Sequence, residues 1–136
     1  MKRYENWPSL LAACVQRHRH RPFKWGRFDC ATFAALAIKA MTGENALQDF
    51  KWKSKEEAIA LLRKHGGLVA MIDQRLERVD VPYAQRGDIV LVEHEGGEGN
   101  MRSRWMAVCT GGDAWGPGAT GLVAAPMSAA VIAWRV

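Results

Sequence analysis

Apolar residues recur at helical spacing through the first half of the chain. The first predicted helix starts at Trp7, ends in the His-Arg run before Pro22, and carries one apolar stripe: Leu10, Leu11, Cys14 and Val15. The second runs from Asp29, a favourable N-cap, to Gly43. Its stripe is Cys30, Phe33, Ala34, Ala37, Ile38 and Met41. The other sides are also mostly apolar, which predicts a helix buried at the centre of the fold.

Two more helices are predicted between residues 54 and 76. Ser54 and Glu57 have capping-box spacing at the start of the third helix, which continues to His65 before Gly66 and Gly67. A further short helix is predicted over residues 68–76.

After residue 76 the pattern changes from helical to extended. Residues 89–92 form a continuous apolar run, typical of a central strand covered on both faces. Residues 95–100 are Gly-rich and predict a hairpin loop before a return strand over residues 105–109. Strands are also predicted over residues 122–125 and 130–136, with a turn at residues 116–118. Helices followed by an antiparallel sheet indicate the α+β class, and residues 1–136 are expected to form a single domain.

Composition is that of a folded chain. The 136 residues are 49% hydrophobic and 24% charged, which argues against general disorder. No apolar run approaches the ~18 residues of a membrane span, and the N-terminus lacks the features of a secretory signal. The 3 cysteines are widely spaced without a CxxC pair, which favours a reducing compartment over a disulfide or zinc framework. No nucleotide or metal motif is present, so no cofactor or metal is expected.

The net charge of +5 comes from one segment. Residues 17–27 hold five basic side chains and no acid: Arg17, Arg19, Arg21, Lys24 and Arg27. A solvated helix end, favoured by the helix dipole, or a local docking patch explains this cluster better than a nucleic-acid site, which remains the weaker alternative. His18 and His20 would diverge on a helix, so they do not predict a metal pair.

Cys30 is the residue whose setting suggests reactivity. At the first turn of a helix its sulfur would lie near free backbone N–H groups and the positive end of the dipole, with Arg27 close by, and these would lower its pKa. The alternative is that Cys30 is the first core residue of the apolar stripe. A nucleophile also needs a base, and His94, at the end of the strand that starts at residue 89, is the one histidine on the predicted sheet.

His18, His20 and His65 are all placed at helix ends, so they are weaker candidates for the base. Trp25, Trp105 and Trp115 are candidate groove residues.

The segment Phe23-Lys-Trp-Gly-Arg-Phe-Asp-Cys-Ala-Thr-Phe resembles the start of the NlpC-type cysteine peptidases, relatives of papain that cleave bacterial cell-wall peptides. It is similar in particular to a branch encoded by tailed bacteriophages and prophages. Matching segments follow in order over residues 41–43, 87–90, 107–111, 115–122 and 133–136. The resemblance therefore covers nearly the whole chain.

This resemblance implies a papain-like fold in which a central Cys-bearing helix packs on a small antiparallel sheet, with Cys30 as nucleophile. The catalytic histidine of the family opens the strand that follows the Gly-Asp strand, and alignment on Thr110 and Gly111 puts Trp105 at that position. Because an indole cannot act as a base, His94 would have to replace it from the neighbouring strand.

The resemblance thus indicates a phage tail component, at or near the tail tip, in which a degenerate peptidase fold serves assembly or docking with other tail proteins. Such a protein would be made in the bacterial host cytoplasm and reside in the virion. The alternative is an active peptidoglycan endopeptidase using Cys30 and His94. The weakest alternative is nucleic-acid binding through residues 17–27.

Overall fold

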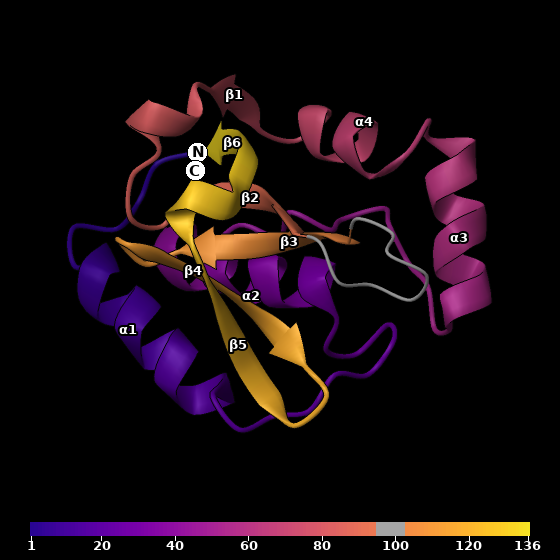
Figure 1. Ribbon diagram of the computed structural model, residues 1–136, viewed down its shortest axis with the longest axis horizontal. Helices are drawn as coiled ribbons and strands as arrows, with labels where there is room; N and C mark the ends of the chain where they lie inside the picture. The colour runs from indigo at the N-terminus through magenta and orange to yellow at the C-terminus, as the bar shows by residue number, and fades with distance from the viewer. Residues whose placement is uncertain (95–102) are drawn as a thin grey trace.

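A computed structural model describes residues 1–94 and 103–136 (Figure 1). Helices occupy the first half of the chain: α1 (Trp7–His18), α2 (Cys30–Thr42), α3 (Lys55–Lys64) and α4 (Leu68–Asp73). The short helix predicted over residues 68–76 therefore ends earlier than expected. The predicted hairpin loop at residues 95–100 lies outside the described residues. Within the described residues, no helix has both the length and the apolar character needed to cross a lipid bilayer.

The second half forms one sheet whose strand order is β1-β6-β2-β3-β4-β5, with every pairing antiparallel. The strands are β1 (Glu77–Val79), β2 (Ile89–His94), β3 (Ser103–Cys109), β4 (Asp113–Gly118), β5 (Gly121–Pro126) and β6 (Ala130–Arg135). Two short 3-10 helices, η1 (Val81–Tyr83) and η3 (Met127–Ala129), connect strands. The α+β class predicted from the sequence is confirmed.

The turn predicted at residues 116–118 is wrong, because these residues belong to β4 and pair with β5. The hairpin turns instead at Ala119 and Thr120, between the two strands. Gly116 serves close packing: an added Cβ would lie 2.7 Å from the Trp105 ring. β1 was missed, since three residues with two exposed side chains carry no recognisable alternation.

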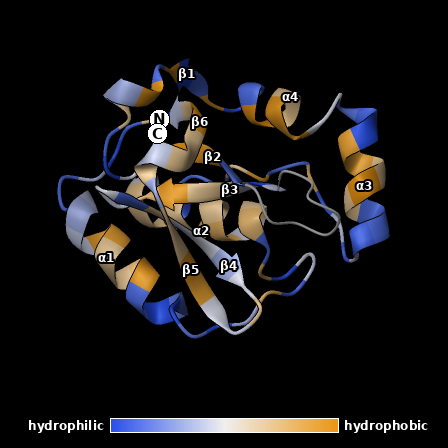
Figure 2. Cartoon of the chain, viewed as in Figure 1, coloured by the Kyte–Doolittle hydropathy of each residue, from blue (hydrophilic) through white to orange (hydrophobic). Residues whose placement is uncertain are grey.

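α2 is the central helix, as predicted. It packs against α1 on one side and against the sheet on the other, and Figure 2 colours it toward the hydrophobic end of the scale. Phe33, Ala37 and Met41 are fully buried, and burial of each large side chain contributes about 1.5–3 kcal/mol. The helix ends at Gly43, whose φ of 80° is the left-handed conformation expected of a C-terminal glycine.

The sheet has two apolar faces, as the continuous run in β2 predicts. The first, here called the helix face, packs against α1 and α2 and includes Ile89, Leu91, Met106, Val108 and Trp134. The second, here called the outer face, includes Val90, Val92, Ala107, Cys109 and Ala133. The outer face is covered partly by Val81 of η1 and Met127 of η3. Successive residues of a strand alternate between these faces.

Asp88 joins the two ends of the chain, which lie next to each other in Figure 1. Its carboxylate is fully buried and forms ion pairs with Arg3 at 2.9 Å and Arg135 at 3.0 Å. It also accepts backbone N–H groups of Gln85 and Val136. Burial lowers the pKa of the Arg3 guanidinium, which the charge of Asp88 opposes.

Candidate functional site

Asp29 determines where Cys30 lies, because it caps the N-terminus of α2. One carboxylate oxygen accepts the Thr32 N–H at 2.9 Å, and the Thr32 hydroxyl accepts the Asp29 N–H at 2.7 Å. The other oxygen accepts the Gly26 N–H at 2.9 Å and the Trp52 indole N–H at 2.7 Å. Asp29 is only 2% exposed, and its carboxylate holds together the loop before α2, α2 itself and the segment that precedes α3.

The Cys30 thiol lies between the start of α2 and β3. Burial is the strongest influence on its pKa and raises it, and the negative charge of Asp29 acts in the same direction. The backbone N–H groups of Met106, Ala31 and Cys30 itself oppose this without reversing it. The lowered pKa expected from the sequence is therefore wrong, because desolvation outweighs the N–H groups and the acting neighbour is Asp29 rather than Arg27.

The structure does not bring His94 to Cys30. In β2 and β3, Val92 pairs with Trp105 and His94 pairs with Ser103. Val92 and Trp105 belong to the outer face, and His94, two residues beyond Val92, shares it. The Trp105 indole N–H donates to His94 Nδ1 at 3.2 Å. The two residues thus form a pair on the side of the sheet opposite Cys30.

The β3 residues that share the Cys30 side are Met106 and Arg104. Both line a pocket together with Cys30, and Arg104 lies 3.0 Å from the Glu93 carboxylate. Neither a methionine nor a guanidinium can act as a general base at neutral pH. Trp105, the position that the family resemblance gave to the catalytic histidine, lies instead on the outer face with Val92.

The other histidines also lie away from the thiol. His18 stacks on Phe28 with ring centroids 5.4 Å apart, and burial, then Arg21 and Arg17, lower its pKa. His65 contacts the Phe50 ring at 5.1 Å, at the end of α3. His20 is exposed in the basic segment. None of the four histidines lines the pocket beside Cys30.

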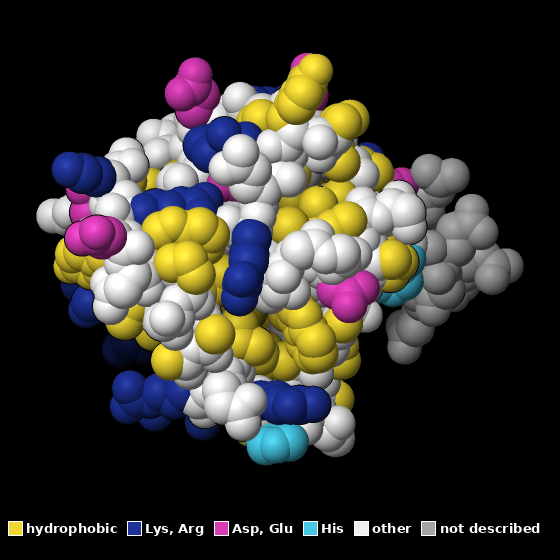
Figure 3. Space-filling view, turned by 90° about the vertical axis from the view of Figure 1, so that its left-hand side faces the viewer, with side chains coloured by type: hydrophobic (Ala, Val, Ile, Leu, Met, Phe, Trp, Pro, Cys, Tyr) yellow, Lys and Arg dark blue, Asp and Glu magenta, His cyan; other side chains and the backbone are white. Residues whose placement is uncertain are grey.

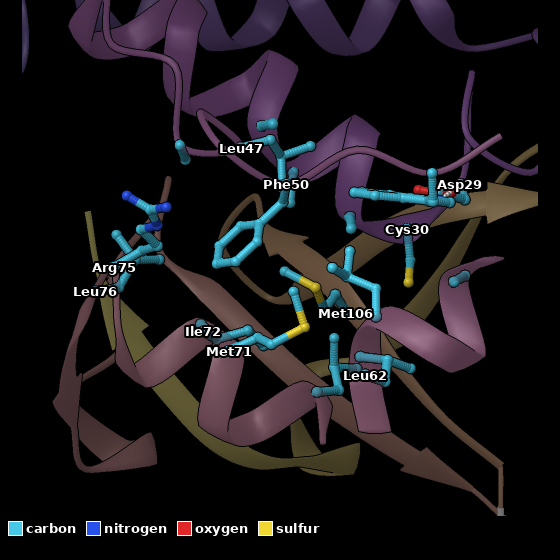
Figure 4. Close-up of a pocket in the computed structure, with 18 of the residues that line it drawn as sticks. Asp29, Cys30, Leu47, Phe50, Leu62, Met71, Ile72, Arg75, Leu76 and Met106 are labelled. Carbon is cyan, nitrogen blue, oxygen red and sulfur yellow. Dashed lines mark hydrogen bonds between the residues drawn. The ribbon is translucent and has the colours of Figure 1, made fainter. Parts of the chain in front are cut away.

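A pocket of about 250 Å³ lies between α2, β3 and the α3–α4 segment. Figure 4 shows Arg75 and Leu76 at one end and Asp29 and Cys30 at the other, with apolar side chains between them. Sequence reasoning missed this pocket. The signal for it was the run of alanines on α2, since Ala31, Ala34 and Ala35 leave space where larger residues would fill it.

The basic segment, residues 17–27, lies at the end of α1 and in the loop that follows. All five of its Lys and Arg residues are exposed. Arg21 stacks on Phe28 at 4.5 Å and donates to the Arg27 carbonyl, so its guanidinium is engaged within the protein. Figure 3, which views the side that carries α1, shows Lys and Arg side chains around hydrophobic ones. Of the groove residues suggested by the sequence, Trp25 is 39% exposed and lies at the pocket.

Over residues 1–94 and 103–136, no cluster of three or more His, Cys, Asp or Glu side chains could hold a metal ion. Residues 2–136 match the family described as a domain of unknown function (DUF6950). No curated protein matches the chain.

Proposed function

The chain belongs to the DUF6950 family, and we propose that it is a phage tail component built on a degenerate NlpC-like, papain-like peptidase fold. Two features support the fold relationship: the in-order resemblance over nearly the whole sequence, and a cysteine at the start of a central helix that packs on an antiparallel sheet. In this proposal the protein acts in assembly or docking at the tail tip, and its partners are other tail proteins.

The observation that supports a loss of catalysis is that the sheet separates Cys30 from His94. A cysteine nucleophile needs a thiolate and a base within hydrogen-bond reach. Here the pKa of the Cys30 thiol is raised, and the strand beside it presents Met106 and Arg104. Losing the base of such a site costs orders of magnitude in rate, even where backbone N–H donors remain.

The basic segment and Trp25 form the proposed docking surface. Exposed Lys and Arg side chains steer association with an acidic partner surface, and a partly exposed tryptophan is a frequent anchor in protein interfaces. Because Arg21 is already held against Phe28, the charges free to contact a partner are those of Arg17, Arg19, Lys24 and Arg27.

Peptide release from purified peptidoglycan tests the loss of catalysis. The wild-type protein and Cys30→Ala are both expected to release no more soluble peptide than a buffer control. Release by the wild type that disappears in Cys30→Ala would establish an active endopeptidase. The N–H groups of Met106 and Ala31 around the thiol would then be the start of its oxyanion site.

Mass spectrometry of purified phage particles tests the tail role, and the protein is expected in the tail fraction. Arg17→Gln combined with Lys24→Gln should reduce its incorporation, whereas the matched pair Arg63→Gln and Lys64→Gln on α3 should not. Absence from purified particles would contradict the proposal. Tight DNA binding that weakens steeply with salt would instead support a nucleic-acid role for residues 17–27.

A further inference from the structure

The pocket beside Cys30 is an unfilled apolar space at the edge of the core. Ala31, Ala34 and Ala35 of α2 form one wall, and Phe50 and Met106 contribute large apolar side chains. Leucines from the opposite side remain only partly buried although they line it: Leu47, Leu61, Leu62 and Leu68. Partly exposed leucines converging on one space indicate a surface that a ligand can cover.

The volume is sufficient for an alkyl chain. A cavity of about 150 Å³ lined by Leu, Ile and Phe stays dry and binds benzene, and this pocket holds about 250 Å³. The side chains labelled in Figure 4 extend the pocket from Arg75 to Cys30, with Phe50, Met71 and Met106 between them. An elongated apolar guest fits this arrangement better than a compact polar one.

Charge around the pocket favours an anionic end on that guest. Arg104 lines the pocket, its side chain is 57% exposed, and one guanidinium nitrogen pairs with Glu93. Of the acids, Asp29 has both oxygens occupied by N–H donors. Asp49 is 78% exposed and lies 3.7 Å from Arg75, and Glu93 lies beside Arg104. Among the described side chains that line the pocket itself, Arg75 and Arg104 are basic and Asp29 is acidic.

We propose that this pocket binds one single-chain fatty carboxylate, with its alkyl chain against the α2 alanines and its carboxylate at Arg104. The planar guanidinium of Arg104 carries five N–H donors, enough to bind the ligand carboxylate beside that of Glu93. This ligand site is independent of the tail role, since it requires neither a partner protein nor chemistry at Cys30.

Calorimetric titration of the full chain with hexanoate, octanoate and decanoate tests the alkyl part. Affinity is expected to rise about fourfold per added methylene, the fold-change that corresponds to burial of one CH₂. No binding of decanoate, or an affinity independent of chain length, would overturn the proposal. This series needs no variant, so misfolding of a mutant cannot obscure it.

Filling the pocket locates the site. Ala35→Phe places a ring in the space that the alkyl chain would occupy and is expected to weaken decanoate binding at least tenfold. Ala13→Phe, on the exposed face of α1, is the matched control and should bind as the wild type does. Equal decanoate affinity of the two variants, both shown to be folded by circular dichroism, would overturn the assignment to this pocket.

The head group is tested separately. Arg104→Gln is expected to weaken decanoate binding about two- to fivefold, the range of an exposed ion pair, and to leave decanol binding unchanged. Arg63→Gln on α3 is the charge-matched control. Decanoate binding that is insensitive to Arg104→Gln and to added salt would overturn the carboxylate contact. These assays use the isolated protein. A failure to bind decanoate would therefore contradict the ligand site alone, whereas absence of the protein from phage particles would contradict the tail role alone.

Discussion

Asp29 and Cys30 are neighbours in the chain, yet the environment of Asp29 stabilises a negative charge and that of Cys30 does not. Every oxygen of the Asp29 carboxylate has a donor, so its buried charge is stabilised. The sulfur of Cys30 also receives N–H groups, but burial outweighs them and the adjacent carboxylate adds to the same effect. A helix N-terminus therefore does not by itself produce a thiolate, because desolvation of the sulfur can outweigh the N–H groups and raise the pKa.

Alkylation of Cys30 by iodoacetamide is expected to be slow at pH 7 and to rise only at pH values above the ordinary thiol range of about 8.5. A raised pKa keeps the thiol neutral at neutral pH, and the thiolate is the reactive form. Peptide mass spectrometry over a pH series would separate it from Cys14 and Cys109, whose pKa values burial also raises. A rate at pH 7 above that of free cysteine would contradict this.

Asp29→Asn is expected to lower the free energy of unfolding by about 2–4 kcal/mol. In either orientation the amide NH₂ would face an N–H donor, from Thr32 or from Gly26 and Trp52, and a buried hydrogen bond would be lost. Urea denaturation measures the change. Asp80→Asn is the control, since Asp80 is exposed and makes no side-chain capping bond; its effect should stay within about 0.5 kcal/mol.

At the level of elements, local signals located the helices well. Asp29 and Thr32 cap α2 reciprocally, and Gly43 ends it, because these interactions involve residues only a few positions apart. At α3, Ser54 Oγ accepts the Glu57 N–H as predicted. The Glu57 carboxylate accepts the Lys53 N–H and the Ser54 hydroxyl instead of the Ser54 backbone N–H of a standard capping box. Strand limits were less predictable, because a strand is stabilised by partners distant in sequence. Gly116 illustrates this, because the ring of Trp105 on the neighbouring strand leaves no space for a side chain at position 116.

The loop between α1 and α2 depends on a close approach at Gly26. Its φ is 74°, and an added Cβ would meet the Trp52 carbonyl oxygen and lie 2.9 Å from Lys53 Cα. Gly26→Ala is expected to destabilise by at least about 2 kcal/mol, which combines left-handed strain with displaced backbone. Gly66→Ala is the matched control, because Gly66 has a φ of 83° and an added Cβ there would make only ordinary van der Waals contact. This substitution should lower the free energy of unfolding by about 1 kcal/mol. Equal melting temperatures would contradict the close approach.

At the scale of the whole molecule, Asp88 links the N-terminal arm, β2 and the end of β6. The sequence placed Gly87 and Asp88 at the start of a strand, but the pairing of Asp88 with Arg3 spans 85 positions in the chain. No local pattern contains that information. The same holds for the pocket, whose walls come from α2, β3 and the α3–α4 segment.

Asp88→Asn is expected to lower the free energy of unfolding by about 3 kcal/mol, because it leaves Arg3 without its buried carboxylate. Chemical denaturation followed by tryptophan fluorescence would measure this. Asp113→Asn, at an exposed position of β4, is the control. A loss below about 1 kcal/mol would show that the Asp88 carboxylate contributes little net stability, as some buried ion pairs do.

The sequence by itself determined the class of the fold, the central position of α2, its two caps and the two-sided burial of β2. Each of these follows from residue type and spacing within about a dozen positions, which is the range over which helical and strand periodicity act. Only the tertiary structure decided that His94 and Trp105 lie across the sheet from Cys30, that desolvation raises the pKa of the thiol, and that a pocket opens beside it. Those outcomes depend on strand register and on packing between distant segments, where a shift of one residue exchanges one face for the other.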